Sequence, residues 1–363
     1  MQAVADTLFT LLRVALHPER EERVAWSVSP DWPLVYRLAT EQGVLAIAWD
    51  GYARLLQEGQ IPTEWQMPRT LKLQWAMNVD KIERRYAQQR EAAADLACHY
   101  AQASIRTVVL KGFAVSAVYP IPSHRECGDL DCYLCGSYEQ GNVIAEKQGG
   151  RVERDYYKHS HIHYKGLMVE NHQFCVAIRG SQERKALERY LQSLVATPSG
   201  HYVEETHLEI PSADFNALFL TAHGFSHFLN EGLKLRHLCD WMMVLKHGEE
   251  QIDWRAFYSL TDRLSYTAFA SVMTALAIRD LGFELHNSAV RSDARYADRV
   301  MNDILWQNNA IYSSGKSLFK QRMMLITNRM QMIWKYRLIY KRSMVVDLCK
   351  MISAYFFEKN PKI

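Results

Sequence analysis

Residues 69–105 form the segment that most restricts the fold, because they contain neither glycine nor proline. The segment is rich in Ala, Gln, Glu, Arg and Leu, which favour the helical state. We therefore predict one long α-helix across it. At Thr107 the pattern changes to the β-branched run TVVLKG, which predicts a strand that ends at Gly112.

Shorter elements lie on both sides of this helix. The expected helices before it cover 5–16, 31–44 and 45–59, and the expected strands after it cover 107–112, 132–134, 151–157, 159–165 and 167–178. Helices are expected over 113–119 and 137–150, between the first strands, and the turn at Lys165 and Gly166 predicts a hairpin. Helical patterns return after Gln182, with one more strand expected over 201–210.

This order of elements predicts an α+β fold. A small mixed sheet with helices would occupy residues 105–182, flanked by an N-terminal helical region, 1–104, and a C-terminal helical region, 183–363.

Charge is distributed unevenly along the chain, although the formal net charge is only +3. Residues 315–363 carry eleven Lys/Arg and two acidic residues. Such a basic tail could bind an anionic partner such as RNA, or it could be the solvated face of helices that pack on the body.

The number of cysteines and the N-terminal segment indicate in which cellular compartment the protein is expected. Seven cysteines are an odd number for a disulfide framework, and Arg13 interrupts the first apolar run, so no secretory signal peptide is expected. No stretch approaches the roughly 20 apolar residues that span a bilayer. We expect a reducing, cytoplasmic location.

The sequence GDLD places two carboxylates at the start of an expected strand. Asp129 and Asp131 stand two residues apart, so their side chains should point to the same face and could chelate a hard divalent cation. Gly128 before them permits a close backbone approach. A D-x-D sequence alone is more often a turn or a solvated strand edge. The full order of strand, glycine turn, helix, D-x-D strand and later acidic strand is more specific.

Further residues complete a candidate site for phosphate chemistry. Glu170 lies on a later strand, with His172 on its face, and could hold a second metal or accept a proton. Lys111 and Gly112 lie at a strand-to-helix turn, where a positive charge and helix N–H groups suit a phosphate. Arg125 could bind another phosphate oxygen bidentately.

These residues resemble a known family, the uncharacterised nucleotidyltransferases of the polymerase-β-like superfamily. The resemblance is carried by Leu110-Lys111-Gly112, Tyr119-Pro120, Arg125 and Gly128-Asp129-Leu130-Asp131, and more weakly by Val169-Glu170-Asn171-His172, His223-Gly224, Gly232-Leu233-Lys234-Leu235-Arg236 and Asp240.

The resemblance implies a small mixed sheet with helices on one side. It implies transfer of a nucleoside monophosphate from an NTP to a hydroxyl or phosphate acceptor, with Mg²⁺ or Mn²⁺ as cofactor. Asp129 and Asp131 would be metal ligands, Glu170 the third carboxylate, and Lys111 and Gly112 would lie at the triphosphate. The acceptor could be a small molecule, a protein or RNA.

The alternative is a catalytically inactive nucleotide-binding or scaffold protein of the same fold. Phe113 follows Gly112 where the wider superfamily favours serine, which supports this alternative.

Several other patterns have competing interpretations. Cys132 and Cys135 form a C-x-x-C near His124 and Cys127, but buried thiols explain them better than zinc does. His223 and His227 are spaced as metal ligands on a helix, although packing or a place in the nucleotide cleft would also explain them.

Two more sets of charged or polar residues stand at regular spacing. Arg236 and Asp240 predict a surface ion pair, and Lys234 and Arg236 could instead reach a triphosphate. His159, His161 and His163 should share one strand face, which could bind a metal but is more often only a partly exposed face.

Overall fold

The computed structural model of the protein describes residues 2–306, 332–340 and 343. The predicted basic tail lies mostly outside the described residues. A described part of it, η3 (Lys335–Tyr340), packs on the body, where Nζ of Lys335 lies 2.7 Å from Oδ2 of Asp303. Within the described residues no helix is long and apolar enough to cross a membrane.

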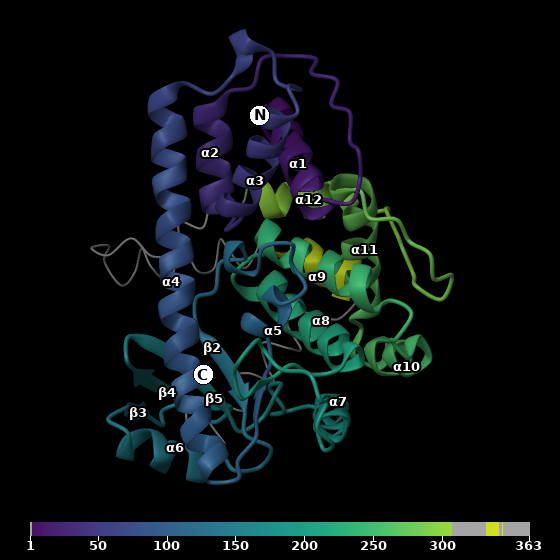
Figure 1. Ribbon diagram of the computed structural model, residues 1–363. Coiled ribbons are helices and arrows are strands. Elements are labelled where there is room, and N and C mark those ends of the chain that lie inside the picture. The colour runs from purple at the N-terminus through teal and green to yellow at the C-terminus, as the bar shows by residue number, and fades with distance from the viewer. Residues whose placement is uncertain (1, 307–331, 341–342, 344–363) are drawn as a thin grey trace, which may run out of the picture.

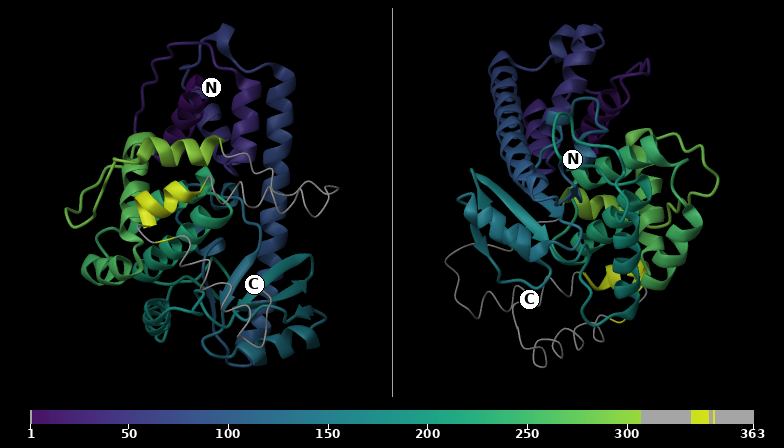
Figure 2. Two further views of the ribbon diagram at one scale, coloured as in Figure 1. Left: turned by 180° about the vertical axis from the view of Figure 1, so that it is seen from behind. Right: turned by 60° about the horizontal axis from the view of Figure 1, so that its bottom comes forward.

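The long helix is confirmed as α4 (Arg69–Gln102). At about 1.5 Å per residue it spans roughly 50 Å. Figures 1 and 2 show the N-terminal helices beside its first half and the sheet beside its second half. Trp75 and Val79 belong to the core cluster of the helical regions, whereas Ala93, Leu96 and Tyr100 belong to the core under the sheet. Helix α4 therefore connects the two cores.

The predicted N-terminal helices are all present: α1 (Gln2–Leu16), α2 (Trp32–Glu41) and α3 (Leu45–Gln57). Gly51 on α3 allows a close crossing of α1, because an added Cβ would lie 2.0 Å from the Leu11 carbonyl oxygen.

The α+β fold is confirmed by a six-stranded sheet in the order β3-β4-β5-β2-β1-β6. Its strands are β1 (Thr107–Val109), β2 (Leu130–Tyr133), β3 (Arg151–Glu153), β4 (His159–Tyr164), β5 (Leu167–His172) and β6 (Leu208–Glu209). The sheet is mixed, because β2 pairs parallel to β5 but antiparallel to β1. The hairpin turn at Lys165 and Gly166 is present, with positive φ at both residues.

The two faces of the sheet have different partners. Leu130, Cys132 and Val169 point toward α4 and α6 (Tyr138–Lys147) and form the core under the sheet. Asp131 and Glu170 alternate with them and must therefore lie on the opposite face. Figure 1 places α8 (Ala213–Asn230) and α9 (Leu235–Gly248) away from α4, whereas the single turn α5 (Phe113–Ser116) contacts α4, with the Tyr86 hydroxyl 2.9 Å from Oγ of Ser116.

The remaining helices complete the C-terminal part: α7 (Gln182–Leu194), α10 (Trp254–Leu264), α11 (Thr267–Leu281) and α12 (Ala297–Trp306). One core cluster contains residues of α1 and α3 together with residues of α9 and α11. The division into regions 1–104, 105–182 and 183–363 stays a prediction.

Candidate active site

Two of the predicted carboxylates lie side by side on neighbouring strands. Asp131 on β2 and Glu170 on β5 are register partners in a parallel pair. His172 lies between their side chains, with Nε2 3.1 Å from Oδ1 of Asp131 and 3.3 Å from Oε2 of Glu170. The parallel register of β2 with β5 thus brings these two acidic groups together.

His172 donates from both ring nitrogens. Its Nδ1 contacts the carbonyl oxygen of Phe174 at 3.1 Å, and a carbonyl oxygen can only accept. Its Nε2 faces two carboxylates, which also accept. Burial opposes the charged form, but the hydrogen bonds with Asp131 and Glu170 outweigh it and raise the pKa of His172. The ring is therefore a cation between the two acids.

Lys111 is the second cation of the cluster. Its Nζ lies 3.0 Å from Oδ2 of Asp131 and 3.5 Å from Oδ1 of Asp129. Although burial acts against its charge, the two aspartates raise the pKa of Lys111. Lys111 thus offsets part of the negative charge of the two aspartates.

The pKa values of the three carboxylates shift in different directions in this environment. Burial raises the pKa of Asp129, and the charge of Asp131 adds to the rise. Burial also acts to raise the pKa of Asp131, but Lys111 and His172 hold it well below its ordinary value. Burial likewise opposes ionisation of Glu170, yet the hydrogen bond from His172 leaves its pKa lowered.

The donor set fits a divalent cation. Oδ2 of Asp131 is buried, and the charge that it meets in this structure is the ammonium group of Lys111, 3.0 Å away. A buried carboxylate oxygen in this state suits a cation, and carboxylate oxygens are the ligands that Mg²⁺ prefers. Asp129, Asp131 and Glu170 could therefore hold one.

The turn between β1 and α5 is built on Gly112. Its φ is +60° and its ψ is −110°, a backbone conformation that residues with a Cβ rarely adopt. Helix α5 is a single turn, shorter than the expected 113–119, because the residue before Pro120 disfavours helical geometry. The phosphate role of Lys111 and Gly112 stays a prediction.

Arg125 is buried in an ion pair that the sequence did not suggest. Its Nε lies 3.0 Å from Oδ1 of Asp240 and its Nη2 lies 2.6 Å from Oδ2. The hydroxyl of Tyr119 donates to Oδ1 of the same carboxylate at 2.7 Å. The expected surface pair of Arg236 with Asp240 is therefore wrong, because Asp240 is buried and paired with Arg125. A phosphate role for Arg125 stays a prediction.

A cavity of about 400 Å³ opens between the sheet and the C-terminal helices. Lys111, Gly112, Arg125 and Asp129 line one wall, and α8, α9 and α11 supply the rest. Both Lys234 and Arg236 line it as well, together with the apolar side chains of Leu220, Trp241, Phe269 and Met273. Lys111 lines the cavity and forms an ion pair with the buried Asp131, so its side chain connects the two.

Three groups of side chains lie close enough to hold a metal ion within the described residues. One is Asp131, Glu170 and His172; a second is His159, His161 and Glu170; the third is His223, His227 and His237. Asp129 is in none of these three groups, and its Oδ1 lies 3.5 Å from Nζ of Lys111.

The expected strand face of histidines is present on β4. His159 is a register partner of His172, and His161 is a register partner of Glu170. The C-x-x-C contributes to none of the three metal groups, and Cys132 is a buried thiol in the core under the sheet.

A family model described as "Uncharacterised nucleotidyltransferase" matches residues 29–282. The chain belongs to this family. No curated protein and no solved structure matches it. The matched region includes the whole sheet and helices α2–α11 up to Gly282, and so contains every residue of the candidate site. The chain is therefore a nucleotidyltransferase.

Some residues around this nucleotidyltransferase site were not predicted. Lys158 immediately precedes β4, and burial lowers its pKa although the charges of Glu170 and Asp131 favour its protonated form. His237 and Glu231 belong to the histidine group. No local pattern marks Lys158 or His237, because only the tertiary fold brings Lys158 near the carboxylates and His237 to the cavity.

Proposed function

We propose that this nucleotidyltransferase binds Mg²⁺ or Mn²⁺ with an NTP at Asp129, Asp131 and Glu170, and transfers the nucleoside monophosphate to a hydroxyl or phosphate acceptor. The observation that carries the proposal is the register pairing of Asp131 with Glu170, with Asp129 two residues before on the same strand segment. Three acids from two segments thus meet beside a cavity that contains Lys111.

A divalent metal, when bound, would supply the positive charge that stabilises the developing charge of the transferred phosphate. Asp129, Asp131 and Glu170 supply the carboxylate oxygens for it. Lys111, which contacts both aspartates in this structure, is close enough to turn its ammonium group toward a phosphate on the cavity side.

The reaction requires one proton to move. An acceptor oxygen forms a bond with the α-phosphorus, the bond from that phosphorus to the β-phosphate oxygen breaks, and pyrophosphate leaves. Glu170 is suited to take the proton of an acceptor hydroxyl, because the hydrogen bond from His172 keeps it ionised.

The cavity offers the nucleotide both charged and apolar contacts. Lys234 and Arg236 line it together with Phe269 and Trp241. Cations suit the triphosphate, and aromatic and apolar side chains suit the base.

The proposal is tested by the position of a label. The protein is incubated with a cell lysate, Mg²⁺ and each NTP, labelled either at the α- or at the γ-phosphate. Nucleotidyl transfer predicts that an acceptor gains the α-label alone, and that Asp129→Asn/Asp131→Asn abolishes the gain. Transfer of the γ-label would show phosphoryl transfer instead. No labelled acceptor and no metal-dependent nucleotide binding would support the inactive binding or scaffold protein.

A further inference from the structure

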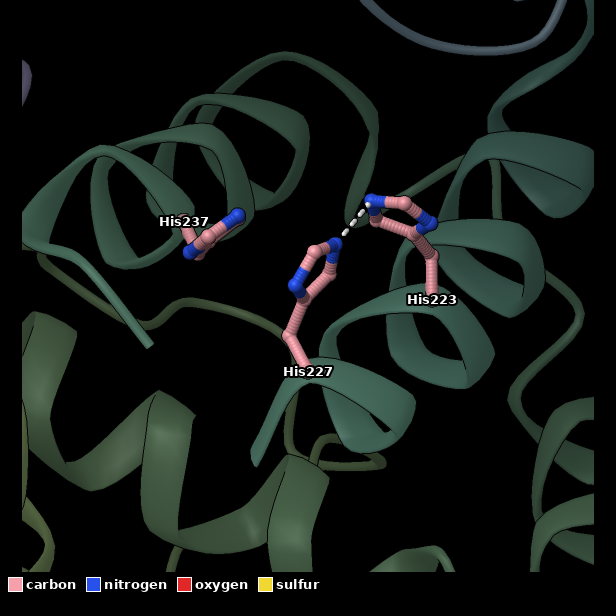
Figure 3. A group of neighbouring side chains, drawn as sticks. All are labelled: His223, His227 and His237. Atoms are coloured by element: carbon pink, nitrogen blue, oxygen red, sulfur yellow. Dashed lines mark hydrogen bonds between the residues drawn. The ribbon is translucent and has the colours of Figure 1, made fainter. Parts of the chain in front are cut away.

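Three histidines from two helices converge on one wall of the cavity (Figure 3). His223 and His227 stand one turn apart on α8, and His237 lies on α9. One nitrogen of each ring lies within 4.8 Å of the others. The Nε2 atoms of His223 and His227 are 3.0 Å apart and point toward each other.

Glu231 orients the ring of His227. Its Oε2 lies 3.0 Å from Nδ1 of His227, and a carboxylate accepts, so this nitrogen carries a proton. Nε2 of a neutral His227 then presents its lone pair toward His223. Metal-bound histidines usually donate their other ring N–H to a carboxylate, a backbone carbonyl or a water molecule, and Glu231 is such a partner for His227.

His237 is held differently. Its Nδ1 accepts a hydrogen bond of 3.0 Å from the backbone N–H of Lys234 at the start of α9. An imidazole that coordinates a cation through one nitrogen carries its proton on the other. Coordination by either nitrogen of His237 therefore gives up this hydrogen bond, which makes His237 the weaker ligand of the three.

We propose that His223, His227 and His237 form a binding site for a transition-metal ion of the Zn²⁺ class, separate from the carboxylate site. Imidazole nitrogens suit Zn²⁺, Co²⁺ and Ni²⁺, whereas Mg²⁺ prefers oxygen. Zn–N bonds of about 2.0–2.1 Å in a tetrahedral centre set the ligand nitrogens roughly 3.3 Å apart, so His223 and His227 need to separate only slightly.

The cavity leaves the fourth coordination position open. Lys234 and Arg236 line the same space. A water molecule or an anionic ligand could therefore complete the centre, as it does in sites with three protein ligands.

The experiment measures metal content and coordination without any activity assay. The full chain is stripped with a chelator and dialysed against Zn²⁺, and bound zinc is counted by elemental analysis. Co²⁺ is added to a second sample, and its visible absorption reports tetrahedral nitrogen coordination. Thermal unfolding of each variant without metal checks that it is folded.

Five variants separate the possible sites. His223→Gln and His227→Gln keep a polar side chain of similar size and should each lose the zinc and the cobalt spectrum. Glu231→Gln should weaken zinc binding by about 10–100-fold, the usual effect of removing such a partner. His237→Gln should weaken it less than the other two histidine changes. His247→Ala, an exposed histidine on the same helix α9, is the matched control and should bind as wild type.

The carboxylate site provides the decisive comparison. Asp129→Asn/Asp131→Asn should retain the zinc. If this double variant lost it while His223→Gln and His227→Gln kept it, zinc would belong to the carboxylates and the proposal would fail. Absence of stoichiometric zinc in the folded wild type would show that the histidines form a hydrogen-bonded pair alone, and would leave the proposed nucleotidyl transfer unaffected.

Discussion

Nζ of Lys111 lies 3.0 Å from Oδ2 of Asp131, so a cation of the protein contacts the carboxylate that we assign to the metal. Asp131 is almost completely buried and has Asp129 as a second negative neighbour. Burying such a cluster of negative charge costs folding free energy unless cations lie beside it. Lys111 and His172 provide that compensation from opposite sides of Asp131.

Removal of Lys111 should therefore make stability depend on metal. Without divalent cations, Lys111→Met should lose about 3–5 kcal/mol of unfolding free energy, as expected when a buried ion pair loses one partner. Mg²⁺ should restore more stability to the variant than to wild type, because it can take over the charge of Lys111. Urea unfolding with and without Mg²⁺ measures both effects, with the exposed Lys81→Met as control. An equal response of both proteins to Mg²⁺ would be inconsistent with metal binding at Asp131.

The buried pair of Arg125 with Asp240 should matter for folding. Arg125→Met leaves the Asp240 carboxylate buried without its bidentate partner and should cost about 3–5 kcal/mol. The exposed pair of Arg295 with Asp293 provides the control, and Arg295→Met should cost less than about 1 kcal/mol. Chemical denaturation compares the two variants. A cost below 1 kcal/mol for Arg125→Met would mean that Asp240 is satisfied by other groups.

Two glycines beside the site should differ in their tolerance of a side chain. Gly112→Ala should cost about 1–3 kcal/mol, because its φ of +60° is strained for alanine. Gly128→Ala should leave stability nearly unchanged, since an added Cβ there meets no atom within 4 Å. Thermal unfolding tests the pair. If Gly128→Ala lost more stability than Gly112→Ala, the strained turn would lie at Gly128 and not at Gly112.

His124 should make stability depend on pH. Its Nδ1 lies 2.7 Å from Oδ2 of Asp50 on α3, and its Nε2 lies 2.7 Å from Oε1 of Glu83 on α4. Burial acts to lower the pKa of His124, but these two carboxylates raise it above its ordinary value. The stabilisation is therefore full below the unfolded pKa of about 6.5 and is lost as the pH rises through the raised value.

The matching experiment compares wild type with His124→Gln. The substitution should cost about 2 kcal/mol near pH 6, and less near pH 9, where the wild-type ring is neutral. Urea unfolding at the two values measures the difference. If the substitution cost the same unfolding free energy near pH 6 and near pH 9, the charge of His124 would contribute nothing to stability.

Local patterns were sufficient for much of the fold and for part of the site. The run of helix formers without glycine or proline predicted α4, and the order of elements predicted Glu170 on a strand after the D-x-D strand. Contacts between distant segments could not be predicted this way. Arg125 and Asp240 are separated by 115 positions, and no periodicity links them. The place of Lys111 among the carboxylates and the cavity wall from α8 and α9 likewise depend on tertiary packing.

We propose that Asp129, Asp131 and Glu170 bind a divalent cation together with a nucleotide. Calorimetric titration with each of the four NTPs, as α,β-methylene analogues that resist transfer, tests it with and without Mg²⁺. We predict that wild type binds at least one analogue in the presence of Mg²⁺, and that Asp129→Asn/Asp131→Asn binds it at least about tenfold more weakly, a loss of 1.4 kcal/mol. The exposed Asp80→Asn should bind as wild type. Equal affinity of the double variant and wild type would contradict the account.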